Sequence, residues 1–115
     1  MLRDFFLGFI KIHILHHAAH EPVFGMALIR ELARHGYDLS PGTLYPVLHS
    51  LERTGYVQCE ARVVQGKVRK YYTITPRGTQ ALEEARAKIH ELVTEVLRGE
   101  GPQALEGREP SAKPR

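Results

Sequence analysis

The chain has 115 residues, the length of a single domain, and its 43% hydrophobic and 25% charged content is ordinary for a globular protein. Its only cysteine, Cys59, excludes a disulfide within the chain and a CxxC metal knuckle, and it fits a reducing cytoplasm. The formal net charge of +3 is concentrated, because residues 40–77 carry six basic and two acidic side chains while the rest is slightly acidic. Such a patch favours a polyanionic partner. Lys11 and His13 interrupt the apolar run at 5–15, so we expect neither a signal peptide nor a membrane span.

The first two predicted elements are helices. One runs from about Arg3 to Ala19 and is ended by Glu21-Pro22, since the residue before a proline disfavours helix. The second runs from about Phe24 to His35, and Gly36 is its expected C-terminal stop. The expected apolar face of the second helix consists of Met26, Ile29, Leu32 and Ala33.

The third predicted helix occupies the stretch SPGTLYPVLHSLERTGYV, residues Ser40 to Val57. Ser40 is a strong N-cap, Pro41 suits the first helical position, and Gly55 is the expected stop. Leucines at i, i+4 and i+7 make one face apolar: Leu44, Leu48 and Leu51. The opposite face is polar, aromatic and basic, with Thr43, Tyr45, His49, Ser50 and Arg53. This face has the chemistry of groove recognition in nucleic acids.

A β-hairpin follows the third helix. Tyr56–Arg62 alternates loosely, Arg69–Thr75 is rich in aromatic and β-branched residues, and Gln65-Gly66 supplies a tight turn between the two strands. Basic side chains surround the tip and the return strand. They make the hairpin suitable for contact with phosphates.

A last helix is predicted from Thr75, its N-cap, with Pro76 at the first helical position. Its apolar residues recur at spacings of 3, 4, 3 and 4: Leu82, Ala85, Ile89, Leu92 and Val96. That seam is typical of a helix that packs on another helix. From Gly99 onward the composition predicts a disordered tail.

These elements predict a mainly α fold with a small β-hairpin, namely a winged helix-turn-helix followed by a dimerisation helix. We place the DNA-binding domain at residues 1–75, the dimerisation helix at 76–98 and the tail at 99–115. The third helix is the reader and the hairpin is the wing. The expected DNA contacts are Ser40, Pro41, Thr43, Tyr45, Lys67, Arg69 and Lys70.

The string S-P-G-T-L-Y-P, with R-K-Y-Y-T-I-T-P-R-G downstream, resembles the PadR family of transcriptional regulators over about residues 5–98. The resemblance implies a homodimer that binds operator DNA, usually as a repressor, and releases it on an inducing signal such as a small molecule. It assigns DNA contact to Ser40, Thr43 and Tyr45 and the wing role to Lys67 and Arg69. It assigns dimerisation to the first and last helices, and the single short last helix resembles the short subfamily.

The first helix carries an unusual group of histidines. Phe6, Phe9, His13, His16 and His20 form a 3, 4, 3, 4 series, a stripe that suits a dimer interface. His13/His17 and His16/His20 have the i, i+4 spacing of helical metal ligands. A structural or interface role is favoured, because no cysteine accompanies these imidazoles. A metal or ligand site and grouped pH sensing remain alternatives.

The sequence therefore favours a cytoplasmic, dimeric DNA-binding regulator without enzymatic activity or cofactor. The alternative is a winged helix used as a protein-interaction module, because this fold does not fix its partner. A metal-dependent hydrolase built on the histidines is disfavoured, since neither HExxH nor a nucleophile motif is present.

Overall fold

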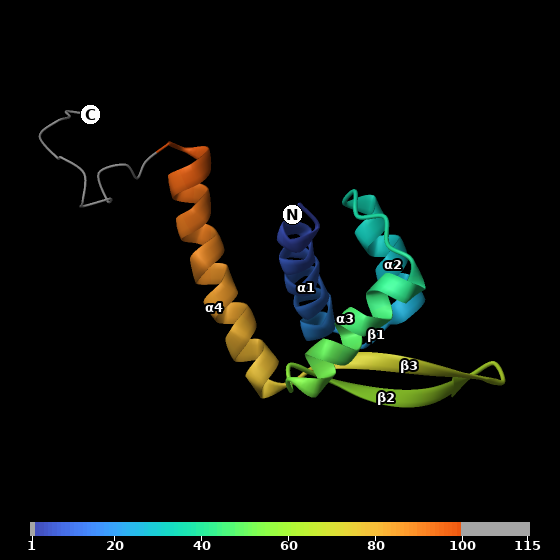
Figure 1. Ribbon diagram of the computed structural model, residues 1–115. Helices are drawn as coiled ribbons and strands as arrows, with labels where there is room; N and C mark the ends of the chain where they lie inside the picture. Colours follow the sequence, from blue (N-terminus) through green and yellow to red (C-terminus); the bar gives the residue numbers. More distant parts are fainter. Residues whose placement is uncertain (1, 100–115) are drawn as a thin grey trace, which may run out of the picture. The chain divides into compact units, whose positions relative to one another are not determined.

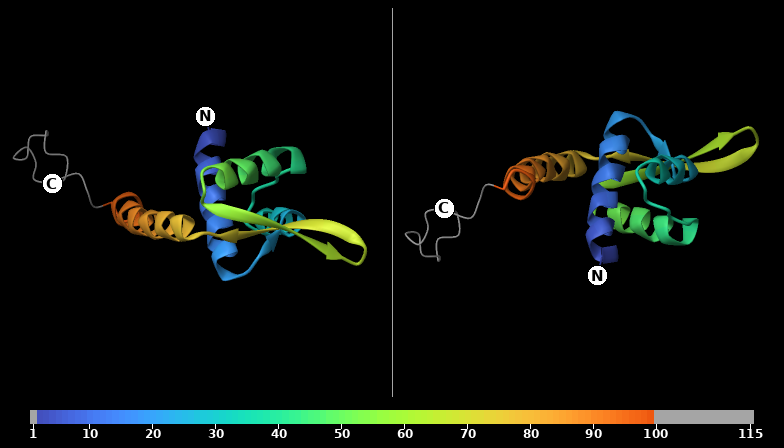
Figure 2. Two further views of the ribbon diagram at one scale, coloured as in Figure 1. Left: turned by 90° about the horizontal axis from the view of Figure 1, so that it is seen from below. Right: turned by 90° about the horizontal axis from the view of Figure 1, so that it is seen from above.

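The computed structural model describes residues 2–99, and within them the chain confirms the predicted winged helix-turn-helix. Helices α1 (Leu2–His20), α2 (Gly25–Arg34) and α3 (Pro41–Arg53) gather over the base of a hairpin made by β2 (Val57–Val64) and β3 (Lys67–Ile74) (Figure 1). The tip of this hairpin projects past the helices, as a wing does (Figure 2). Helix α4 (Pro76–Leu92) follows and continues into a short π-helical turn, η1 (Val93–Leu97). The expected tail from residue 100 lies outside the described residues.

Local capping signals set the helix boundaries. Gly36 and Gly55 have φ of +90° and +85° and end α2 and α3, as expected. In each case the next N–H returns to the helix: Tyr37 donates to the Leu32 carbonyl at 3.0 Å and Tyr56 to the Leu51 carbonyl at 2.9 Å. These are Schellman ends, which glycine adopts without the penalty that a side chain would bring.

The sheet contains a short strand that the sequence did not suggest. β1 (Val23–Phe24) pairs antiparallel with Tyr72 and Tyr71 of β3, so the strand order is β1-β3-β2. The expected second helix therefore starts one residue later, at Gly25. Two residues are too few to show a period, and only the long-range pairing with β3 makes them a strand.

The hairpin itself is as predicted. Val57 pairs with Ile74 at its base and Val64 with Lys67 at its tip. Gln65 and Gly66 have φ of +53° and +79°, the left-handed pair that matches the twist of a two-residue hairpin turn.

One apolar core lies between the helices and the base of the sheet. It takes buried residues from every helix as far as the start of α4: Ile10, Ile14, Leu15, Leu28, Leu32, Leu44, Val47, Leu48, Leu51, Val57, Tyr72 and Leu82. The expected α2 face was partly wrong, because Met26 is 40% exposed and Ala33 is exposed, whereas Leu28 is buried. A ten-residue helix is too short for its periodicity to identify the buried face reliably.

Candidate nucleic-acid interface

The N-terminus of α3 presents polar groups to solvent. Ser40 is the N-cap in extended backbone, and its carbonyl accepts the N–H groups of Thr43 and Leu44 at 3.0 Å. Its hydroxyl makes no capping bond and instead donates to Thr43 Oγ1 at 3.4 Å. The N-terminal end of a helix favours anions because its first N–H groups point outward, so this end suits a phosphate.

Tyr45 lies differently from the other expected contacts. Its ring packs against Gly25 at the start of α2, closely enough that a Cβ at Gly25 would overlap its hydroxyl and ring edge. The side chain is half-buried against the core. The structure therefore places Tyr45 as a packing residue that joins α3 to α2.

The exposed face of α3 is instead a stripe at spacings of 4, 3 and 4. It consists of Gly42, Pro46, His49 and Arg53, and the exposed Pro41 precedes it. Pro46 lies inside the helix on this exposed side, and it has no N–H to donate to the Gly42 carbonyl. His49 was expected on the polar face opposite Leu44, Leu48 and Leu51 but was not among the expected DNA contacts, and Pro46 was in neither set.

The basic side chains of the wing differ in their surroundings: the lysines are exposed and the arginines are stacked on aromatic rings. Lys67 and Lys70 are exposed, whereas Arg69 is half-buried with its guanidinium 4.7 Å above the Phe24 ring. Arg62 pairs with Arg69 across the hairpin and lies 4.8 Å above the Tyr71 ring. Stacking of this kind holds a guanidinium in place. Arg62 also donates to Glu60 Oε1 at 3.3 Å, so part of its donor set is already engaged. Arg62 was not among the expected DNA contacts, although it lies as many residues from the Gln65-Gly66 turn as Arg69 does.

The apolar residues expected at a dimer interface form two groups, one on α1 and one on the last helix. Phe6 and Phe9 of α1 are 43% and 46% exposed, and Ile89, Leu92 and Val96 are 40%, 50% and 63% exposed. Leu82 is only 3% exposed, because it packs in the core, and Ala85 is half-buried. Further exposed apolar side chains extend both groups: Phe5, Val93 and Leu97.

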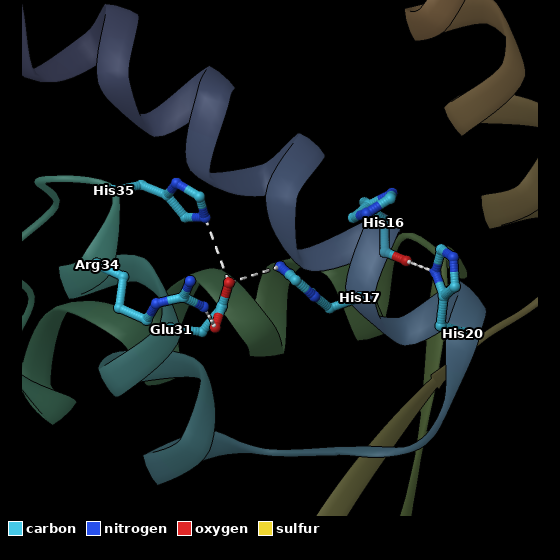
Figure 3. A network of polar contacts seen from close by, with 6 residues as sticks. All are labelled: His16, His17, His20, Glu31, Arg34 and His35. Atoms are coloured by element: carbon cyan, nitrogen blue, oxygen red, sulfur yellow. Dashed lines mark hydrogen bonds and ion pairs between the residues drawn. The ribbon is translucent and has the colours of Figure 1, made fainter.

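The histidines of α1 meet residues of α2 rather than forming a ligand set. Glu31 Oε2 lies 3.7 Å from His17 Nε2 and 3.3 Å from His35 Nε2, and Arg34 donates to Glu31 Oε1 at 2.7 Å (Figure 3). Hydrogen bonding by Arg34 holds the pKa of Glu31 below its usual value. His20 Nδ1 lies 2.8 Å from the backbone carbonyl of His16. Among residues 2–99, no group of three or more histidine, cysteine or acidic residues is arranged to hold a metal ion.

None of the helices within residues 2–99 combines the length and apolarity needed to cross a membrane.

The sequence model of the transcriptional regulator PadR-like family matches residues 14–84 of the chain. The chain is 49% identical over 106 residues to the transcriptional regulator Rv3488 of Mycobacterium tuberculosis, covering 92% of this chain and 99% of that protein.

Solved structures agree with this comparison. A PadR family transcriptional regulator from Eggerthella lenta superposes with a TM-score of 0.74 at 32% identity, over 89% of this chain and 90% of that one. A PadR-like transcriptional regulator from Bacillus cereus superposes with a TM-score of 0.73 at 30% identity, over 79% and 90% of the two chains. The chain therefore belongs to the PadR-like family of transcriptional regulators.

Proposed function

We propose that this regulator acts in the cytoplasm as a homodimeric repressor that binds a specific operator and is released by an inducing signal. One observation carries the DNA-binding part: the exposed stripe of α3 and the basic wing belong to the one segment of the chain with a large positive excess, residues 40–77. A nucleic-acid duplex offers base edges to the helix and phosphates to the wing.

The proposed binding mode gives each exposed group a partner. Gly42, His49 and Arg53 on the α3 stripe face the major groove, while the hydroxyls of Ser40 and Thr43 and the α3 N-terminus bind a phosphate. Lys67 and Lys70 neutralise flanking phosphates, and stacked Arg62 and Arg69 offer fixed donors beside them. Tyr45 supports this surface from behind.

The homodimer is proposed from the unpacked apolar side chains. Phe5, Phe6 and Phe9 of α1 are 43–57% exposed, and a second exposed group extends from Ile89 to Leu97. Exposed apolar groups of this extent usually mark an interface, and a second copy covers both kinds in a two-fold arrangement. Two copies of α3 then read two half-sites, as an operator with two-fold symmetry requires.

The salt dependence of DNA binding tests this proposal. A palindromic DNA duplex taken from the region upstream of the gene that encodes this protein should bind. Its log Kd should rise steeply with the logarithm of the salt concentration, because neutralised phosphates release counterions. Lys67→Ala combined with Lys70→Ala should reduce that slope by about two for each protomer and weaken binding to all sequences alike.

The matched control also removes two cations, through Arg86→Ala and Lys88→Ala on α4. Both residues are exposed and belong to α4, not to the α3 and wing segment proposed to bind DNA, so the slope should stay as in the wild type. A protein-interaction module, the second candidate, would show no duplex binding even at low salt. Equal slopes in the wing variant and the wild type would remove the wing from the proposed contacts.

A further inference from the structure

Two imidazoles contact a single carboxylate where α1 meets the end of α2, and a third imidazole stacks on them. The imidazole cluster consists of His13, His17 and His35 with Glu31 and Arg34. His13 is stacked on His35 with ring centroids 4.9 Å apart and lies nearly parallel to His17 at 6.5 Å. His17 and His35 both approach Glu31 Oε2 (Figure 3). None of these residues belongs to the proposed DNA-contacting surface.

The cluster is joined directly to the turn that positions α3. His35 is the C-cap of α2, and the left-handed Gly36 follows it. His13 also meets Tyr37 of this turn edge to face, at 5.6 Å between ring centroids. The turn is thus fastened to α1 by the stack of His35, His13 and Tyr37, and to α2 by its backbone hydrogen bonds.

The cluster contains too few negative charges for its imidazoles. Glu31 is already paired with Arg34, so with neutral imidazoles the charges balance. The side chains of Glu31 and His17 are only 27% and 28% exposed, so solvent screens added charge incompletely. Glu31 Oε2 contacts His17 and His35, whereas a proton on His13 places a cation inside the stack without an ion pair of its own.

His13 is the member for which a charge is least favourable. It faces His16 and His17 of its own helix, His35 and Glu31 of α2, and the uncharged Tyr37 ring. Burial and the neighbouring imidazoles lower its pKa from the usual 6.5, and Glu31 offsets this only in part. A histidine whose pKa is lowered by folding binds fewer protons in the folded than in the unfolded protein, so stability falls as the pH drops below about 6.5.

We propose that the imidazole cluster makes operator binding proton-sensitive: protonation of His13 places a cation in the stack with His17 and His35, separates the stack, releases the turn before α3 and lowers affinity for DNA. The inference rests on the proposed DNA-binding function. The operator binds the protein with the turn fastened, so DNA selects the deprotonated cluster. By linkage, bound DNA in turn disfavours protonation of the cluster.

The first test is the pH dependence of operator affinity between pH 7.5 and 5.5 at constant ionic strength. We expect the wild-type Kd to rise only at pH values below 6.5, once the pH falls below the lowered pKa of His13 in the free protein, by up to about tenfold per pH unit for each linked proton. His13→Phe keeps a ring in the stack without a titrating group, and its affinity should not fall.

A matched control and a second variant make the test decisive. His90→Gln removes an exposed histidine of α4, and its pH profile should follow the wild type. His13→Gln serves if the phenyl ring disturbs packing, since it also cannot take up a proton at these pH values. Parallel pH profiles for the wild type and both His13 variants would overturn the inference.

The second test observes the imidazole directly. The pKa of His13, followed by NMR of the ring protons, should be lower in the operator complex than in the free protein. Equal values in the two states would contradict the proposed linkage. If no duplex binds at pH 7.5, the DNA-binding proposal itself fails. The proton sensitivity of the cluster is then tested by thermal unfolding alone: His13→Phe should abolish the acid-induced loss of stability expected for the wild type, and an unchanged loss would contradict it.

Discussion

At the scale of single residues, the packing of Tyr45 against Gly25 determines how α3 is held to α2. The tyrosine ring occupies the space that a side chain at position 25 would need, and the contact involves the ring and hydroxyl of Tyr45. Tyr45 is half-buried and in contact with the core. A residue expected to read DNA therefore also acts as part of the scaffold.

This contact predicts a strong coupling between two substitutions. Gly25→Ala should destabilise the fold by about 1–3 kcal/mol, because the new methyl group overpacks the site. Tyr45→Ala should cost about 2 kcal/mol, less than a fully buried aromatic residue. In the Tyr45→Ala background, Gly25→Ala should then cost little, because its obstacle is gone. Urea unfolding without DNA measures all four proteins of this double-mutant cycle, and additive losses would contradict the contact.

The wing cations show why the role of a residue is not readable from its type alone. Arg69 and Lys70 are neighbours in the sequence, yet Arg69 stacks on Phe24 while Lys70 is exposed. Alternation along β3 explains part of the difference, since successive side chains point to opposite faces. The rest depends on Phe24, which comes from a strand that no local pattern predicts.

At the scale of elements, the first turn of α4 is fixed to the base of the wing. Thr75 Oγ1 accepts the Gly78 N–H at 3.0 Å, which is the expected N-cap, and the Thr75 hydroxyl donates to the Gly55 carbonyl. Gly78 is buried directly against the backbone carbonyl of Tyr56. The close approach is possible because residue 78 has no side chain.

Gly78→Ala is therefore expected to destabilise the protein although alanine favours helix. The obstacle is backbone, which cannot rotate away as a side chain would, so a loss of about 1–3 kcal/mol should appear in thermal or urea unfolding. The control is Gly42→Ala in α3, where the nearest atom to a new Cβ is Ser40 Oγ at 3.7 Å. That change should stabilise the free protein by up to about 1 kcal/mol. Equal effects at the two glycines would mean that α4 does not begin as described.

At the scale of the whole molecule, Ile89, Leu92 and Val96 are exposed within one chain, and the proposed dimer is what covers them. Leu92→Asp should yield monomers, because burying a carboxylate in an apolar interface is strongly unfavourable. Operator affinity should fall with it, since a monomer reads only one half-site. Sedimentation velocity measures the first effect and a DNA titration the second.

The control for the dimer prediction is Ala87→Asp, which adds the same charge to α4 at an exposed position off the apolar seam. This variant should remain dimeric. A Leu92→Asp protein that keeps the wild-type mass in solution would show that the seam is not the interface.

The parts of the fold that follow from the sequence are those with local causes. Ser40, Gly55 and Thr75 set helix ends through their own backbone and side-chain chemistry, and Gln65-Gly66 sets the wing turn. Three features depend on contacts between distant segments and were not predicted: strand β1, the inward packing of Tyr45, and the burial of Leu82 in the core instead of the seam. The spacing of Leu82 suits either role, because one helix face can serve a core and an interface in turn.

The pairing of β1 with β3 limits how this regulator can be re-engineered. Val23 and Phe24 bond to Tyr72 and Tyr71, and Phe24 also supports Arg69. A chimera in which another protein receives this wing would therefore inherit Arg69 without the Phe24 that holds its guanidinium. Grafts of residues 57–74 should work only when positions 23 and 24 are exchanged with them, so that the transplantable unit is discontinuous in the sequence.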